Sequence, residues 1–88
     1  MSTLANNITT QVAAKNVRFK GDVLFVALSD GREMSVPLDQ IEWLGWLAQA
    51  TPEQRANWSL EPGGFAVFWD DLDDGIEVCH LLTMQPLT

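Results

Sequence analysis

The chain has 88 residues, 47% of them hydrophobic, and a formal net charge of −7 at pH 7. This length fits one domain, and the single cysteine, Cys79, excludes a disulfide within the chain. No segment approaches the roughly 18 apolar residues that cross a bilayer, and the N-terminus lacks the basic start and apolar run of a secretory signal, so we expect a cytoplasmic protein outside the membrane.

Most of the negative charge lies in the last third of the chain. Residues 56–88 contain six acidic residues and no Lys or Arg, which places −6 of the net charge there. An acidic region repels phosphate, so direct binding of nucleic acid is not expected and a basic protein partner is favoured. The alternative is that the charge only keeps a small protein in solution.

The first part of the chain predicts an antiparallel β-meander. β-branched and aromatic residues predict three strands, at residues 11–19, 23–29 and 32–36. The dipeptide Asp30-Gly31 favours a tight hairpin between the last two, because both residues tolerate positive φ. A free edge of such a meander would allow two copies to pair as a homodimer.

A main helix is predicted over residues 38–50. Asp39 is expected to cap its N-terminus, with Glu42 completing a capping box. The apolar residues cover a wider arc than one buried face needs, and we expect Trp43 and Trp46 on this arc to be partly exposed.

A second, short helix is predicted within ATPEQRANW, residues 50–58. Thr51 suits the N-cap, Pro52 suits the first helical position, and Gln54 completes a capping box. The only base close to the acidic third is Arg55, which we expect to pair with a local carboxylate.

The remaining elements are short. Residues 58–60 are predicted to be extended, 65–69 to be a strand, and 70–75 to be a turn. Residues 76–82 are predicted to be a last strand or a short helical segment, with strand favoured for 76–78 only. Trp58 and Trp69 are predicted to be core residues. The sequence therefore predicts an α+β fold, with an antiparallel β-meander, one main helix, a second short helix and one or two C-terminal strands. Residues 1–10 are predicted to be a flexible N-terminus, and 11–88 a single small α+β domain.

These elements carry motifs in a recognisable order. DGRE at 30–33, VPL at 36–38, ATPEQRANW at 50–58, the pair Gly63-Gly64 and FWDDLDDGI at 68–76 together resemble a bacterial family known as domain of unknown function 2442. The resemblance covers about residues 15–83. It implies a small α+β domain without established catalytic activity. Members often occur beside small toxin-like proteins, which implies an antitoxin-like or adaptor role.

The acidic run at 70–77 does not fit a calcium loop. With Gly75 at the sixth position of an EF-hand, the third ligand would be Leu72 and the twelfth Leu81, and neither side chain offers an oxygen. A looser divalent site remains an alternative to a solvated turn whose aspartates accept backbone hydrogen bonds. No cofactor is expected, and catalysis by these carboxylates lacks the cleft and raised pKa that it needs.

Cys79 and His80 are the only cysteine and the only histidine of the chain. In a strand their side chains would point to opposite faces, so a nucleophile–base pair is not expected. The set is too small for a zinc site with Cys/His spacing, and Cys79 is predicted to be a small core residue.

The favoured function is a non-enzymatic protein-binding module, antitoxin-like or an adaptor, with a basic protein as partner. Its predicted binding residues combine helix tryptophans and turn aspartates: Trp43, Trp46, Asp70, Asp71, Asp73 and Asp74. An acidic mimic of nucleic acid, which inhibits a DNA- or RNA-handling enzyme, is an alternative from another class. A metal-dependent enzyme is a further alternative, which the sequence favours least.

Overall fold

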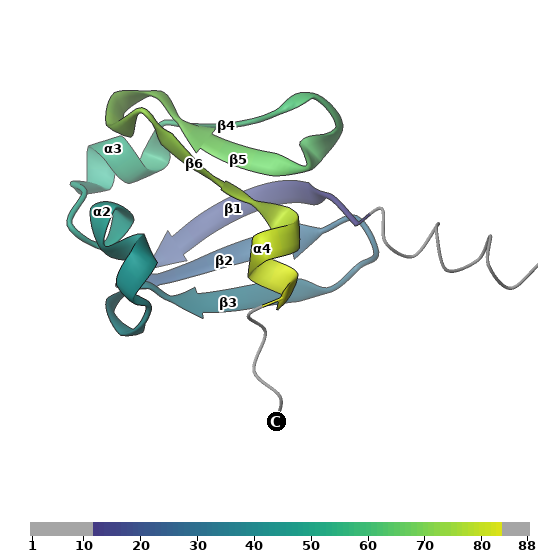
Figure 1. Cartoon of the computed structure of the whole chain (residues 1–88), viewed down its shortest axis with the longest axis horizontal. Coiled ribbons are helices and arrows are strands. Elements are labelled where there is room, and N and C mark those ends of the chain that lie inside the picture. The colour runs from purple at the N-terminus through teal and green to yellow at the C-terminus, as the bar shows by residue number, and fades with distance from the viewer. Residues whose placement is uncertain (1–11, 84–88) are drawn as a thin grey trace, which may run out of the picture.

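Two three-stranded antiparallel sheets form the fold, with short helices connecting and covering them (Figure 1). The structure is a computed structural model that describes residues 12–83. It confirms the predicted α+β class. The predicted flexible segment, residues 1–10, lies outside the described residues, and no helix within residues 12–83 is long and apolar enough to cross a membrane.

The first sheet is the predicted meander. It contains β1 (Ala14–Lys20), β2 (Val23–Leu28) and β3 (Glu33–Pro37), in the order β1-β2-β3. Alternate residues of β2 and β3 are buried, as a sheet with one face on the core requires. Because β3 is an edge strand, pairing of two copies along the meander stays a prediction.

The hairpin between β2 and β3 forms at Asp30-Gly31, as predicted. Gly31 has φ of 94°, and its amide donates to the carbonyl of Leu28 at 3.1 Å. The carboxylate of Asp30 accepts from the backbone amide of Arg32 at 3.1 Å, which lowers the pKa of Asp30 below its usual range. Local chemistry therefore accounts for this turn.

The second sheet contains three strands, where the sequence predicted one or two C-terminal strands and an extended segment at 58–60. Its strands are β4 (Trp58–Leu60), β5 (Ala66–Trp69) and β6 (Asp74–Glu77), in the order β4-β5-β6. The last strand ends at Glu77, and the helix α4 (Val78–Thr83) starts directly after it. The prediction of a strand over 76–78 was therefore right in type but displaced by about two residues.

The link between β4 and β5 brings the two sheets together. It contains the short 3-10 turn η3 (Pro62–Gly64), where Gly64 is buried with φ of 76°. A Cβ atom added at Gly64 would lie 2.6 Å from the carbonyl oxygen of Ala14 in β1. The Gly63-Gly64 pair therefore permits a close approach of the second sheet to the first.

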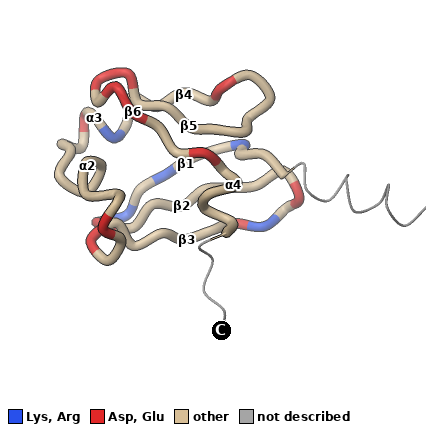
Figure 2. Tube along the Cα trace, viewed as in Figure 1, with Lys and Arg blue, Asp and Glu red and all other residues tan. Residues whose placement is uncertain are grey.

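Charge is divided between the two sheets (Figure 2). Three of the five basic residues, Lys15, Arg18 and Lys20, lie on β1, whereas the second sheet, from Trp58 to Glu77, contains no Lys or Arg. The acidic character predicted from the sequence thus belongs to the second sheet and its turns.

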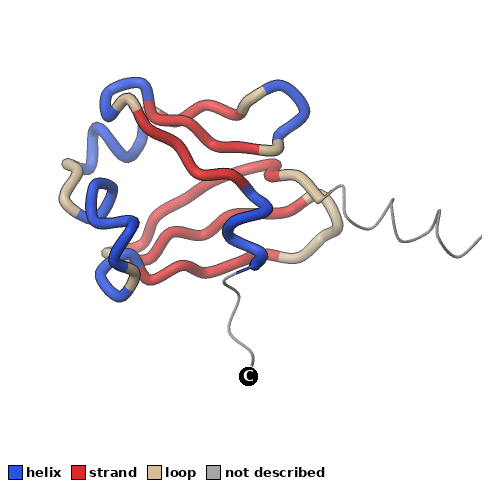
Figure 3. The backbone as a smooth tube through the Cα atoms, in the orientation of Figure 1, coloured by secondary structure: helices blue, strands red, loops and turns tan. Residues whose placement is uncertain are grey.

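The predicted main helix over 38–50 is wrong. The segment forms three short pieces, namely η1 (Leu38–Gln40), η2 (Glu42–Leu44) and α2 (Gly45–Ala48) (Figure 3). Ile41 is extended between the two 3-10 turns, with φ of −119° and ψ of 109°, and neither Asp39 nor any other side chain caps η1, η2 or α2. The break lets Leu38, Leu44 and Leu47 all reach the core, which one straight helix would not allow.

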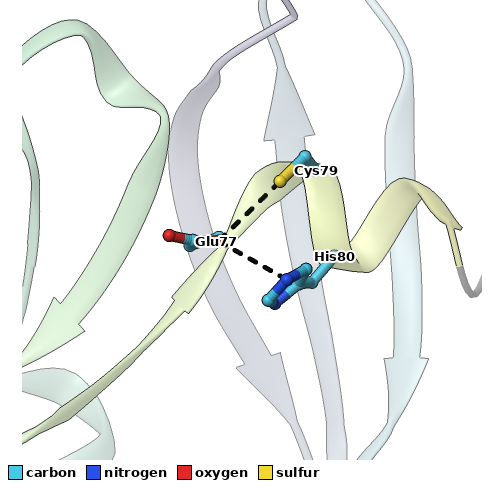
Figure 4. A group of neighbouring side chains, drawn as sticks. All are labelled: Glu77, Cys79 and His80. Atoms are coloured by element: carbon cyan, nitrogen blue, oxygen red, sulfur yellow. Dashed lines mark hydrogen bonds and ion pairs between the residues drawn. The ribbon is translucent and has the colours of Figure 1, made fainter.

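The core lies between the sheets and centres on Trp69, which is fully buried. The ring of Trp69 meets Phe19 of β1 and Trp46 of α2 edge-on, with ring centroids 6.3 Å and 5.8 Å away. The helix α4 crosses the first sheet in Figures 1 and 4 and buries Val78 and Leu81 in this core.

Candidate functional site

The two helix tryptophans of the predicted binding set have different environments. Trp43 is 46% exposed, and its ring meets the imidazole of His80 edge-on with centroids 6.4 Å apart. Trp46 is partly buried, with its ring against Trp69. Trp43 is therefore available to a partner, whereas Trp46 contributes mainly to packing.

The predicted aspartates lie in an exposed turn, where two of them accept hydrogen bonds. The turn contains η4 (Asp70–Leu72), and Asp73 closes it in the left-handed region with φ of 52°. Asp71 accepts from the side-chain amide of Asn57 at 3.1 Å, and Asp74 accepts from the amide of Gly75 at 2.8 Å. These bonds support the solvated-turn interpretation.

The structure separates the predicted residues into two groups. Asp74 is the first residue of β6 and Glu77 is the last, and α4 follows Glu77. The acidic turn and α4 therefore lie at opposite ends of a strand about 13 Å long (Figure 1). The four aspartates gather at one end, while Trp43 lies beside His80 of α4 at the other.

Arg55 of the short helix α3 (Pro52–Ala56) is a structural residue. Its guanidinium donates to the carboxylate of Asp22 at 3.1 Å, 33 residues away in sequence rather than local as predicted. It also donates to the backbone carbonyls of three residues, Gly21, Leu47 and Ala48. With its side chain only 11% exposed, Arg55 ties the β1–β2 turn to the end of α2.

Cys79 is exposed, which corrects the prediction that it is a core residue. The reason is that Val78 begins a helix, so Val78 and Leu81 face the core while Cys79 and His80 face solvent. The apolar residues Val78 and Leu81 have helical spacing, and this signal could have predicted the outcome. The expected opposite orientation of Cys79 and His80 belonged to a strand and does not apply.

Glu77, Cys79 and His80 converge at the start of α4 (Figure 4). The thiol of Cys79 donates to Oε1 of Glu77 at 3.8 Å, and Nε2 of His80 lies 3.5 Å from the same oxygen. Within residues 12–83 this is the one group of three or more potential metal ligands whose donor atoms all lie within 4.8 Å of one another. Cys79 and His80 were not expected to act together, because in a strand their side chains would point to opposite faces, whereas the structure places both on the first turn of a helix.

A groove of about 630 Å³ runs beside this group. Its walls come mainly from β5, β6 and α4, and Phe65, which is 46% exposed, lies at its edge. Two carboxylates, Glu61 and Glu77, line the groove, and no Lys or Arg of the described chain does. The groove is therefore apolar with an acidic rim.

Contacts connect Trp43 to this groove through α4. Trp43 touches His80, His80 pairs with Glu77, and Glu77 lines the groove together with Phe65. We use the name α4 surface for the residues that these contacts and the groove link, namely Trp43, Glu61, Phe65, Glu77, Cys79 and His80.

Comparisons with known proteins identify the fold and the family, and no curated protein matches the chain. A crystal structure of a protein of unknown function from Rhodospirillum rubrum is similar with a TM-score of 0.69 at 19% identity, over 88% of this chain and 92% of that one. A solution structure of an uncharacterized protein from Chromobacterium violaceum has a TM-score of 0.69 at 21% identity, over 93% of this chain and 75% of that one. At these identities the likeness shows the fold alone. Residues 14–84 match the family described as "Protein of unknown function (DUF2442)", and the chain belongs to that family.

Proposed function

We propose that this protein is a non-enzymatic protein-binding module whose α4 surface holds a basic partner through an apolar anchor. The observation that carries the proposal is the position of Trp43 and Phe65. They are the two large hydrophobic side chains left markedly exposed in the described residues, and both lie on this surface. Exposed aromatic residues beside a groove are typical of the energetic centre of a protein interface.

The charge around the groove supports a basic partner. Glu61 and Glu77 line it, no Lys or Arg of the described chain does, and the second sheet has no Lys or Arg. The four aspartates of the acidic turn extend the negative field along the same sheet. Such a field accelerates encounter with a positively charged protein, while the apolar contacts hold the complex.

Two observations together suggest the class of partner: the negative charge around the groove, and the resemblance to a family whose members often occur beside toxin-like proteins. A small basic toxin-like protein would meet both requirements, so we place the protein among antitoxin-like or adaptor modules. A cytoplasmic location suits the exposed thiol of Cys79, because reducing conditions keep it free.

The test is calorimetric binding to the purified product of the neighbouring gene. Phe65→Ala and Trp43→Ala should each weaken binding on the order of 30-fold, equivalent to about 2 kcal/mol for a hot-spot residue. The matched control is Phe25→Ala. Phe25 is an aromatic of β2 that lies under the guanidinium of Arg18, 4.1 Å from the ring centroid, outside the α4 surface.

The control should leave the affinity unchanged. If Phe25→Ala weakens binding as much as Phe65→Ala, or if both α4-surface variants bind normally, the proposed surface is wrong. If no purified partner candidate binds the unaltered chain, the binding function itself is wrong.

An acidic mimic of nucleic acid is a second candidate, favoured by the exposed carboxylates of Asp70, Asp71, Asp73 and Asp74 in one turn. This function predicts binding to the basic groove of a nucleic-acid enzyme, with a steep loss of affinity as salt rises. Replacing these four aspartates with asparagine should then abolish binding, whereas Phe65→Ala should not affect it. The α4-surface proposal predicts the opposite, namely that Phe65→Ala weakens binding more than replacement of the four aspartates does.

A further inference from the structure

We propose that Glu77, Cys79 and His80 form a binding site for Zn²⁺. The three residues supply a carboxylate oxygen, a thiolate sulfur and an imidazole nitrogen, which are the donors that Zn²⁺ takes in proteins. This inference concerns a metal and goes beyond the proposed protein-binding function, on which it does not depend.

Two of the three donor separations match those of one tetrahedral ion. With the usual zinc bond lengths, oxygen and nitrogen ligands lie about 3.4 Å apart, and oxygen and sulfur ligands about 3.6 Å apart. The observed separations from Oε1 of Glu77 are 3.5 Å to Nε2 of His80 and 3.8 Å to Sγ of Cys79. The third separation, between Sγ of Cys79 and Nε2 of His80, lies within 4.8 Å. Movement of these two exposed side chains toward each other would bring it to the roughly 3.6 Å that sulfur and nitrogen ligands of one zinc ion require.

The backbone that carries these side chains is held in place. Glu77 pairs with Ala66 across the second sheet, and the amide of Val78 donates to the carbonyl of Phe65 at 2.9 Å. Burial of Val78 and Leu81 fixes the first turn of α4. The ring of Trp43 lies edge-on to the imidazole of His80, and this contact limits the orientations of the third ligand.

The charges also match. Zn²⁺ binding releases the thiol proton of Cys79 to the solvent, so the ion faces one thiolate, one carboxylate and one neutral imidazole. The glutamate and thiolate together neutralise the ion. Three protein ligands leave one coordination position, which a water molecule fills.

Tag-free full-length protein titrated with Co²⁺, a spectroscopic substitute for Zn²⁺, tests the site. We expect a thiolate-to-cobalt charge-transfer absorption that saturates at one ion per chain and disappears when Zn²⁺ is added. Cys79→Ser should abolish this absorption. Glu77→Gln and His80→Ala should each weaken Zn²⁺ affinity at least about tenfold, since loss of outer-shell partners alone costs that much.

Glu61→Gln is the matched control, because Glu61 lines the same groove but lies outside the ligand group. It should leave the affinity unchanged. All three ligand residues are exposed, so the variants should keep the fold, which circular dichroism verifies. Absence of the charge-transfer absorption, equal losses in Glu61→Gln and Glu77→Gln, or Zn²⁺ binding that survives Cys79→Ser but is lost on replacing Asp70 and Asp73 would overturn the proposal.

Discussion

The indole Nε1 of Trp69 donates a 3.0 Å hydrogen bond to the backbone carbonyl of Arg55. The bond joins the two segments by which the sequence most clearly resembles its family, ATPEQRANW and FWDDLDDGI. It satisfies the one polar atom of a fully buried tryptophan side chain and fixes α3 against the second sheet. These segments therefore act together as a folding unit, beside the guanidinium contacts of Arg55.

Removal of the Arg55 side chain should destabilise the fold. Arg55→Ala loses hydrogen bonds to Gly21, Leu47 and Ala48 as well as the pair with Asp22, from a side chain that is nearly buried. We expect a loss of about 2 kcal/mol in the free energy of unfolding, measured by urea denaturation. Arg18→Ala is the control, because the Arg18–Glu33 pair is exposed and should contribute less than about 1 kcal/mol. Equal losses would contradict this assignment.

Trp69 should behave as a structural residue and Trp43 as a surface residue. Trp69→Phe loses volume in the core and leaves the carbonyl of Arg55 without its donor, so we expect about 2 kcal/mol of destabilisation. Trp43→Ala removes an exposed side chain and should change stability by about 0.5 kcal/mol or less. Thermal unfolding of both variants measures the two changes in stability. A large loss of stability in Trp43→Ala would show that Trp43 has a packing role.

Gly64 should tolerate no side chain. Gly64→Ala combines a positive φ with a Cβ 2.6 Å from a backbone oxygen, and we expect more than about 2 kcal/mol of destabilisation. Gly31→Ala has a similar φ but open space around the added atom, so its loss should stay near 1 kcal/mol. Chemical denaturation of both variants gives the two losses in the free energy of unfolding. Their difference measures the cost of the steric contact at Gly64 apart from the cost of the positive φ. If the two losses are alike, the close approach of the sheets at Gly64 does not prevent a side chain there.

The capping box of α3 should contribute measurably, unlike the one expected at Asp39. Thr51 accepts from the amide of Gln54 at 3.1 Å, while the Gln54 side chain accepts from the amide of Thr51 at 3.0 Å. Thr51→Ala should cost about 1 kcal/mol, and Thr51→Ser should restore most of it. Asp39→Ala is the internal control and should have no such effect, because no side chain caps η1. Urea midpoints of the three variants provide the measurement.

Asp30 should titrate below the usual range for an aspartate. The largest cause is the backbone amide of Arg32, so Arg32→Ala should still leave the pKa of Asp30 depressed. Because the folded pKa is the lower one, Asp30 stabilises the fold above its unfolded pKa, and this contribution is lost as pH falls through the folded pKa. Carboxyl NMR titration checks the midpoint. A normal pKa in the unaltered chain would contradict the hydrogen bond.

The sequence predicted correctly those features that depend on residues close to one another in the chain. The Asp30-Gly31 hairpin and the Thr51–Gln54 capping box both formed as predicted, since turn and cap geometry depend on a few consecutive residues. β-branched and aromatic residues likewise predicted the three strands of the meander, which the structure contains. The prediction from apolar spacing was wrong at residues 38–50, where a wide apolar arc was interpreted as one continuous helix.

Tertiary packing decided everything that needs residues far apart in the chain. Ile41 breaks the expected helix because Leu38 and Leu47 both have to reach one core. Cys79 became exposed, and met Glu77 and His80, because Leu81 and Val78 occupied the buried side of α4. The sequence alone determined the family, the fold class, the local turns and caps, and the acidity of the last third. The tertiary structure decided which aromatic side chains stay exposed and which donor groups converge. The physical reason is that the two sheets and α4 pack around one core, and only some of their side chains fit into it.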